Sequence, residues 1–187
     1  MNIMPDENKN VEKTENPVWE VVKVVIISVA IVLPIRTWIA QPFMVAGASM
    51  EPNFHEGEYL IVDELSYQFR SPQRGEVIIF RFPLNPSEFF IKRIIGLPGE
   101  TVEIKGGKVT IKSSGGVFML DEAYLPPLLD TGPERVAELK SGEYFVMGDN
   151  REHSSDSRVW GVLPSDKITG RALVRLWPVR EAGFIGE

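Results

Sequence analysis

An apolar stretch near the N-terminus constrains the fold of this chain more than any other feature. Val21–Ala40 is almost wholly apolar, and its two charged residues, Lys23 and Arg36, lie near its ends. About twenty residues of α-helix rise ~30 Å, which is the thickness of a bilayer core. The sequence therefore predicts a transmembrane anchor helix over residues 18–40, preceded by a flexible polar tail over residues 1–17.

Two other interpretations of the apolar stretch stay open. A buried core helix would need one apolar stripe, whereas here apolar residues cover every face. A cleavable targeting segment would end in small residues, as Ala46-Gly47-Ala48 does, but the residues before the stretch are acidic rather than basic. Positive charges near the two ends are nearly balanced, so charge does not predict which side of a membrane the N-terminus occupies.

The rest of the chain has the pattern of a β-rich domain. Short segments rich in Val, Ile and Phe alternate with Gly, Pro, Asn and Ser, and Lys105–Lys108 is typical of a hairpin turn. The predicted strands are Glu58–Val62, Glu76–Phe82, Phe89–Ile95, Thr101–Ile104, Lys108–Ile111, Tyr144–Met147 and Ala172–Trp177. A short helix is predicted around Glu134–Leu139. We therefore predict a mainly β fold, an antiparallel sheet or barrel-like domain over residues 41–187.

Composition excludes several classes of function. The 187 residues carry 20 Lys and Arg against 26 Asp and Glu, a net charge of −6, whereas a nucleic-acid binder needs a basic face. The absence of cysteine excludes disulfide scaffolds, thiolate zinc sites and cysteine nucleophiles. Only His55 and His153 are present, which excludes a His-rich metal site, so we expect neither a metal nor another cofactor.

Lys92 is the first residue with a candidate chemical role. On a strand over Phe89–Ile95, its side chain would share an apolar face with Phe90 and Ile94. An edge-strand lysine that discourages aggregation is the ordinary explanation. The functional alternative is a lysine whose pKa is lowered by burial until it acts as a neutral base near neutral pH.

Ser49 is the candidate nucleophile. It lies in Ala46–Pro52, a loop of mostly small residues just after the apolar stretch, where backbone N–H groups are free to bind an oxyanion. A turn or a helix N-cap would use the same hydroxyl without any chemistry. His55 lies nearby in an acidic stretch, which is typical of a solvated surface histidine rather than a base.

A third polar segment, Gly148–Arg158, has the composition of a surface loop. A calcium loop is a weak rival, because the sharp-turn glycine and the closing carboxylate are both missing. His153 could serve Ser49 as a base, with Asp149 or Asp156 orienting it, and spacing does not exclude this triad. The triad ranks below the lysine because nothing around the histidine indicates burial.

Taken together, these segments resemble the bacterial type I signal peptidase family, whose members remove signal peptides from exported preproteins. The resemblance extends from the apolar stretch to about Val179. Its motifs stand in order along the chain: Ser49–Pro52 (SMEP), Gly57–Tyr67 (GEYLIVDELSY), Arg74–Pro83 (RGEVIIFRFP) with Phe90–Glu100 (FIKRIIGLPGE), and Gly148–Gly161 (GDNREHSSDSRVWG). One Ser-Met pair would be weak evidence, whereas the ordered set is specific.

The resemblance implies a Ser–Lys dyad rather than a triad. Ser49 would attack the scissile carbonyl, and Lys92 would take its proton and later protonate the leaving amine. Ser154 matches the family serine that orients the lysine. The polar residues that organise the site match Arg93, Asp149, Asp156 and Arg158. Some members carry an oxyanion-binding serine where this chain has Gly47, so the resemblance implies backbone N–H donors, chiefly that of Ser49.

The resemblance also implies a substrate and a location. Family members bind the signal peptide as an added strand and admit small side chains at Ala-x-Ala sites, because their pockets are shallow. Residues expected to shape those pockets, each of which could equally pack in the core, are Val45, Met50, Phe54, Phe90 and Ile91. The expected location is a cell membrane, crossed once, with membrane lipid as a partner, the N-terminus in the cytoplasm and the catalytic domain outside. The short segment 101–143 implies a small inserted β subdomain.

Two other classes of protein share some of these features. Self-cleaving repressors use a similar Ser–Lys β fold, but they need an N-terminal DNA-binding domain, for which residues 1–17 are too short and too acidic. A membrane-tethered β-domain that binds peptides without cleaving them stays open, because sequence alone does not show that Ser49 and Lys92 meet.

Overall fold

A computed structural model describes residues 17–34, 40–127 and 129–186. The chain divides into two units, Met1–Thr37 and Trp38–Glu187. In the first unit, α1 (Pro17–Pro34) is a helix of 18 residues whose valine and isoleucine side chains are largely exposed. Within these ranges, no helix has both the length and the apolar character needed to cross a membrane.

The helix ends earlier than the predicted anchor. α1 stops at Pro34, and Ala40 already belongs to strand β1 (Ala40–Met44), where it is paired with Asp63 of the neighbouring strand. The last residue of the predicted helix, Ala40, is therefore in a strand, because its backbone pairs with the sheet. Residues 35–39 of the predicted anchor, and residues 1–16 of the predicted tail, lie outside the described residues.

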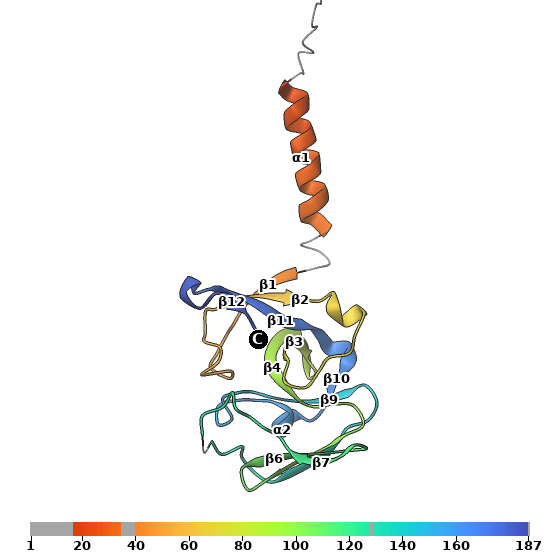
Figure 1. Ribbon diagram of the computed structural model, residues 1–187, viewed down its shortest axis with the longest axis vertical. Helices are drawn as coiled ribbons and strands as arrows, with labels where there is room; N and C mark the ends of the chain where they lie inside the picture. Colours follow the sequence, from red (N-terminus) through yellow and green to blue (C-terminus); the bar gives the residue numbers. More distant parts are fainter. Residues whose placement is uncertain (1–16, 35–39, 128, 187) are drawn as a thin grey trace, which may run out of the picture. The chain divides into compact units, whose positions relative to one another are not determined.

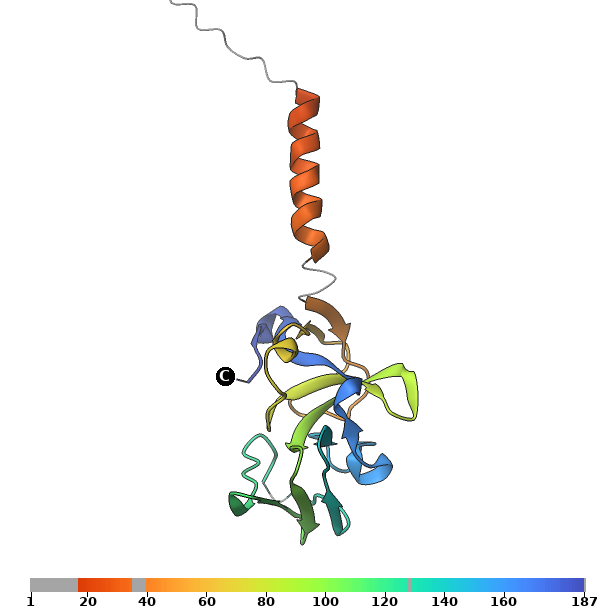
Figure 2. The ribbon, with the colours of Figure 1, turned by 90° about the vertical axis from the view of Figure 1, so that its right-hand side faces the viewer.

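The second unit confirms the predicted mainly β, antiparallel fold. Among the described residues its strands form two sheets, and the larger has eight strands in the order β1-β2-β11-β3-β4-β9-β10, with β12 paired to β11 (Figure 1). The further strands of this sheet are β2 (Tyr59–Asp63), β3 (Val77–Phe82), β4 (Asn85–Gly96), β9 (Glu143–Met147), β10 (Leu163–Pro164), β11 (Ile168–Trp177) and β12 (Gly183–Phe184). Figure 2 shows the tip of the β3–β4 hairpin projecting from the rest of this unit.

The smaller sheet lies at the end of this unit opposite β1 and β2 (Figures 1 and 2). Its order is β7-β6-β5-β8, and its strands are β5 (Thr101–Lys105), β6 (Lys108–Ser113), β7 (Gly116–Met119) and β8 (Arg135–Glu138). The predicted hairpin is confirmed, because Lys105 pairs with Lys108. The predicted helix at 134–139 is wrong. Arg135–Glu138 pairs antiparallel with β5, and that backbone pairing overrides the local helical preference.

Short helices complete the described fold: η2 (Ser66–Gln68), α2 (Ser157–Trp160), η3 (Ser165–Lys167) and η4 (Val179–Glu181). Apolar side chains of β3 alternate between two buried clusters, with Val77 and Ile79 in one and Ile78 and Phe80 in the other. Both faces of the centre of the larger sheet are therefore buried. A side chain from β4, the neighbour of β3, can be enclosed there even when it is polar.

Candidate active site

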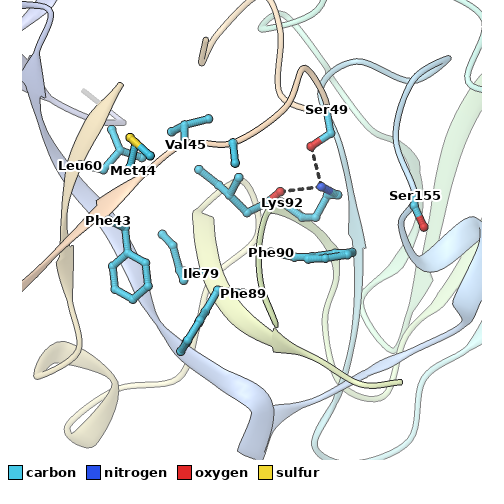
Figure 3. A pocket seen from close by; sticks show the side chains of 12 residues that line it. Phe43, Met44, Val45, Ser49, Leu60, Ile79, Phe89, Phe90, Lys92 and Ser155 are labelled. Atoms are coloured by element: carbon cyan, nitrogen blue, oxygen red, sulfur yellow. Dashed lines mark hydrogen bonds between the residues drawn. The ribbon is translucent and has the colours of Figure 1, made fainter. Parts of the chain in front are cut away.

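Ser49 and Lys92 meet in the structure. Ser49 lies in the loop that follows β1, and Lys92 lies in β4, where its backbone is paired with Ile78 of β3. The Lys92 Nζ donates a hydrogen bond to the Ser49 Oγ at 2.7 Å and another to the backbone oxygen of Ile91 at 2.8 Å (Figure 3). The two residues predicted from sequence as nucleophile and base are therefore in direct contact.

Burial shifts the pKa of Lys92 toward neutral pH. The residue is only 3% exposed, and no salt bridge joins it to a carboxylate in the described part of the chain. Desolvation lowers the pKa of its ammonium group to about 8, although the charges of Asp156 and Asp149 act to raise it. A neutral amine is thus accessible near neutral pH, and a neutral amine can take the proton of a hydroxyl group.

The loop that carries Ser49 is held by the segment after β9. The backbone N–H of Asn150 donates to the backbone oxygen of Ser49 at 3.0 Å, and its side-chain Nδ2 donates to the backbone oxygen of Ala48 at 3.0 Å. A Cβ atom added at Gly148 would lie 2.4 Å from the Ser49 oxygen and 2.2 Å from the Ser154 Oγ. Glycine is the residue that permits this close approach.

Sequence reasoning includes Gly148 and Asn150 in a motif but assigns neither a role. Both residue types are also ordinary in surface turns, so their presence in a polar loop has a simple explanation. The backbone contacts that distinguish them form only when the segment after β9 folds against the Ser49 loop. The one signal in the sequence is their position just after an apolar strand, at the start of the longest matching motif.

Asp156 is a fully buried carboxylate that orders this segment. It accepts hydrogen bonds from the Arg158 side chain, both at 2.8 Å, and from the backbone N–H of Gly148 at 3.0 Å. Burial alone would raise the pKa of Asp156, but its hydrogen bonds and the Arg158 charge hold it below the usual value. The buried Ser154 hydroxyl lies close enough to Asp156 to help lower the pKa of that carboxyl group. Its geometry nevertheless does not make a full hydrogen bond to any of the described residues.

Arg93, which follows Lys92 in β4, forms a second polar group with Asp149. The Arg93 guanidinium binds Asp149 through two hydrogen bonds, at 2.9 Å and 2.6 Å, and lies 4.1 Å from the centre of the Tyr124 ring. Asn53 donates to the same carboxylate at 2.9 Å, which ties it to the loop after Ser49. This group joins four separate segments of the chain, but in the part of the structure described it makes no hydrogen bond to Ser49 or Lys92.

An apolar pocket of about 300 Å³ opens beside the Ser49–Lys92 pair (Figure 3). Its lining residues are Phe43, Met44, Val45, Ala46, Ser49, Leu60, Ile79, Phe89, Phe90, Ile91, Lys92 and Ser155. Of the residues expected to shape the substrate pockets, Val45, Phe90 and Ile91 line this pocket. Met50 and Phe54 are instead buried in the adjoining core cluster, and neither is among the described lining residues.

The histidines lie outside this arrangement. His55 is exposed and its Nδ1 lies 3.8 Å from a Glu51 carboxylate oxygen, and His153 is exposed as well. The described partner of the Ser49 hydroxyl is Lys92 rather than a histidine. Across residues 17–34, 40–127 and 129–186, no group of three or more His, Asp or Glu side chains is placed to hold a metal ion.

Comparisons with known proteins agree with the motif pattern. The family described as "Signal peptidase, peptidase S26" matches residues 18–177. Signal peptidase I of Leptolyngbya laminosa is 42% identical over 183 residues, which cover 93% of this chain and 87% of that protein. Signal peptidase I of Bacillus amyloliquefaciens is 34% identical over 190 residues, covering 95% of this chain and 94% of that protein.

A crystal structure of a signal peptidase I from Enterococcus faecalis aligns with 55% of this chain and 97% of its own, at 30% identity and a TM-score of 0.47. The family match and the two relatives carry the assignment, because they span most of this chain. The chain belongs to the signal peptidase family, peptidase S26.

Proposed function

We propose that this protein is a membrane-bound serine endopeptidase that removes signal peptides from exported preproteins and cuts after Ala-x-Ala-like sites. The observation that carries the proposal is the 2.7 Å hydrogen bond between the Lys92 Nζ and the Ser49 Oγ, at the edge of an apolar pocket. The relatives reported above bear the name signal peptidase I, which supports the same substrate class.

The proposed reaction uses Ser49 as nucleophile and Lys92 as general base. Neutral Lys92 takes the hydroxyl proton while the Ser49 Oγ attacks the scissile carbonyl carbon, and the resulting ammonium then protonates the leaving amine. An ester to Ser49 remains. Water attacks that ester with Lys92 again accepting a proton, which releases the carboxylate of the signal peptide and restores the Ser49 hydroxyl.

The surrounding residues would serve this dyad in two ways. Asp156 and Arg158 order the segment that carries Ser154, and the buried Ser154 hydroxyl lies beside Gly148, which packs closely against the Ser49 loop; this supports an orienting role. Because Gly47 has no side chain to donate, the backbone N–H of Ser49 would bind the oxyanion. Arg93 and Asp149 would hold the framework.

The pocket supports a preference for small side chains. Its walls come from the end of β1 with the residues that follow it and from the middle of β4, so that an extended peptide can lie along them as an additional strand. Phe43 and Phe89 contact edge to face, with ring centres 5.3 Å apart, and narrow the space for substrate side chains. Alanine fits such a site, whereas larger side chains would contact these rings.

The membrane part of the proposal is that the apolar segment containing α1 anchors the chain, with the N-terminus in the cytoplasm and the catalytic domain on the outer face. Exposed apolar side chains on all sides of α1, such as Val21, Val25 and Ile31, support it, since a helix of this kind needs an apolar environment. Carbonate extraction of membranes and protease protection of intact cells test anchoring and orientation. Release by carbonate, or digestion of the N-terminal end from outside the cell, would contradict this part.

The direct test is cleavage of a peptide whose apolar segment ends in Ala-x-Ala, using the full chain in detergent with a chelator present. We expect the parent to cut after the second alanine and both Ser49→Ala and Lys92→Ala to be inactive while folded. Activity that survives Lys92→Ala but not His153→Ala would replace the dyad with a triad. A folded parent that binds the peptide without cutting it would make a peptide-binding module the better description.

A further inference from the structure

Asn150 contacts both peptide groups that flank Ser49. Its side-chain Nδ2 donates to the Ala48 oxygen at 3.0 Å, and its backbone N–H donates to the Ser49 oxygen at 3.0 Å. The two donors of one residue thus fix the chain on either side of the proposed nucleophile. None of the motif residues assigned above to the dyad or to its orientation makes either contact.

The bond to Ala48 has a consequence for the oxyanion site. The Ala48 carbonyl and the Ser49 N–H belong to one planar trans peptide group, in which they point in opposite directions. Fixing the direction of the carbonyl therefore fixes the direction of the N–H. Within the described residues the Ser49 N–H donates no hydrogen bond, so it is free to donate to a substrate.

We propose that Asn150 is a positioning residue that aims the Ser49 N–H at the oxyanion of the tetrahedral intermediate. This inference rests on the proposed peptidase function. It gives the Asn150 amide a role that acts through the backbone of Ser49 rather than by contact with the substrate.

The Ala48–Ser49 peptide group depends on this support, although Met50 beside it is buried in the core, because few other contacts act on that peptide group itself. Gly47 has a φ of +77°, and a Cβ atom added there would meet nothing within 4 Å. The backbone N–H of Glu51 also donates to the Ala48 oxygen, but at 3.2 Å and from within the same turn. Asn150 supplies the support from outside the loop, and it follows Asp149, which is itself fixed by Arg93.

The test compares three variants of the full-length protein in detergent. Asn150→Ala removes the side-chain donor but keeps the backbone N–H that holds Ser49. Asn150→Asp keeps the shape and replaces the donor with an oxygen that repels the Ala48 carbonyl, so the test survives if the alanine variant does not fold. Glu152→Gln is the matched control, because Glu152 is exposed in the same segment and its side chain makes no hydrogen bond or ion pair in the described structure.

We expect kcat to fall about 10-fold in Asn150→Ala and further in Asn150→Asp, with KM within about twofold of the parent, since removing an oxyanion donor altogether costs ~100–1000-fold. A peptide aldehyde, which adds to the serine and creates the oxyanion, should lose affinity by the same factor as kcat. The Ala-x-Ala product peptide should bind as before, and the lysine-dependent limb of the pH profile should stay in place.

Three results would overturn the inference. One is a kcat within twofold of the parent in both folded Asn150 variants while Ser49→Ala is inactive. Equal losses for the aldehyde and the product peptide would instead place Asn150 in substrate binding. A displaced pH profile would mean that it acts through Lys92. Failure of the peptidase proposal is distinguishable, because Ser49→Ala would then cut as fast as the parent.

Discussion

Lys92 and Arg93 are neighbours on β4, yet the fold treats their charges in opposite ways. Lys92 is 3% exposed and has no carboxylate in contact with it among the described residues. Arg93 has a side chain that is 13% exposed and binds a carboxylate, Asp149, that is 1% exposed. Adjacent residues of a strand point to opposite faces, so one sequence step separates an amine with no salt-bridged carboxylate from a guanidinium that has one.

The difference follows from the chemistry of the two groups. A guanidinium stays protonated under all ordinary conditions, so a partly buried one needs a partner, which Asp149 supplies with two hydrogen bonds. An amine can lose its proton instead, and desolvation lowers the pKa of Lys92 to about 8. The guanidinium with a carboxylate partner is suited to hold the fold together, and the amine without one is suited to exchange protons.

The largest expected effect separates the two residues by activity. Lys92→Ala should lower kcat/KM by at least about 1000-fold, because the proposed general base is removed. Arg93→Ala should retain at least about a tenth of the activity of the parent, measured on the folded fraction, because Arg93 does not contact the Ser49–Lys92 pair. Equal losses in two folded variants would show that the ion pair takes part in the chemistry and would remove the distinction.

The next effect is on stability, and it has opposite signs at the two positions. Arg93→Met leaves the buried Asp149 without its partner and should lower the free energy of unfolding by about 3 kcal/mol. Lys92→Met removes a group whose pKa falls from 10.5 to about 8 on folding, which corresponds to a cost of about 3 kcal/mol at pH 7. After the lost Ser49 hydrogen bond is subtracted, this variant should be about 2 kcal/mol more stable than the parent.

The sign can be checked against pH. Between pH 8 and 10.5 the unfolded chain binds more protons at Lys92 than the folded chain, so the stability of the parent rises with pH across that window. The advantage of Lys92→Met should therefore shrink over the same window. Denaturant unfolding of both variants at several pH values measures it, and an advantage that did not change with pH would show that burial does not disfavour the ammonium form.

The sequence pattern predicts where Lys92 lies better than it predicts the pKa of Lys92. Alternation within Phe89–Ile95 places Lys92 on an apolar face, and the resemblance to signal peptidases pairs it with Ser49, as the structure also does. The value of its pKa depends on how closely both faces of the sheet are covered, which local sequence does not encode. Strand periodicity likewise predicts most strands, whereas the strand at Arg135–Glu138 follows from pairing with β5.

Residues of the candidate site were predictable to the extent that their side chains act directly. Met50 and Phe54 have the right character for pocket walls, but apolar side chains on a loop fill either a pocket or a core, and the tertiary fold places these two in the core. Asn150 and Gly148 lie against the backbone of a segment about a hundred residues away, as the spacing of 102 between Ala48 and Asn150 shows. Turn-forming residues give no local sign of such contacts.

A smaller effect tests how closely Gly148 packs against the Ser49 loop. Gly148→Ala places a methyl group 2.4 Å from the Ser49 oxygen and 2.2 Å from the Ser154 Oγ, so the Ser49 loop must move. We expect kcat/KM to fall about 100-fold, since small displacements of reacting groups have effects of this size. Gly115→Ala is the control, because the nearest atom there is 3.7 Å away in an exposed turn. Unchanged activity in Gly148→Ala would mean that the site has more room than these distances indicate.

The smallest effect, about 10-fold per pH unit, is the dependence of kcat/KM on pH. The proposed mechanism needs neutral Lys92, whose pKa is lowered to about 8 by burial, so the rate should rise with pH and level off above about 8. Because the charge of Asp149 acts to raise that pKa, Asp149→Asn should move the rising limb to lower pH. His153→Ala should leave the limb in place, since that exposed side chain is outside the pocket. If the rising limb of kcat/KM stayed fixed in Asp149→Asn but moved in His153→Ala, the titrating base would be the histidine. The contrast between Lys92 and Arg93 on the two faces of β4 would then concern packing alone.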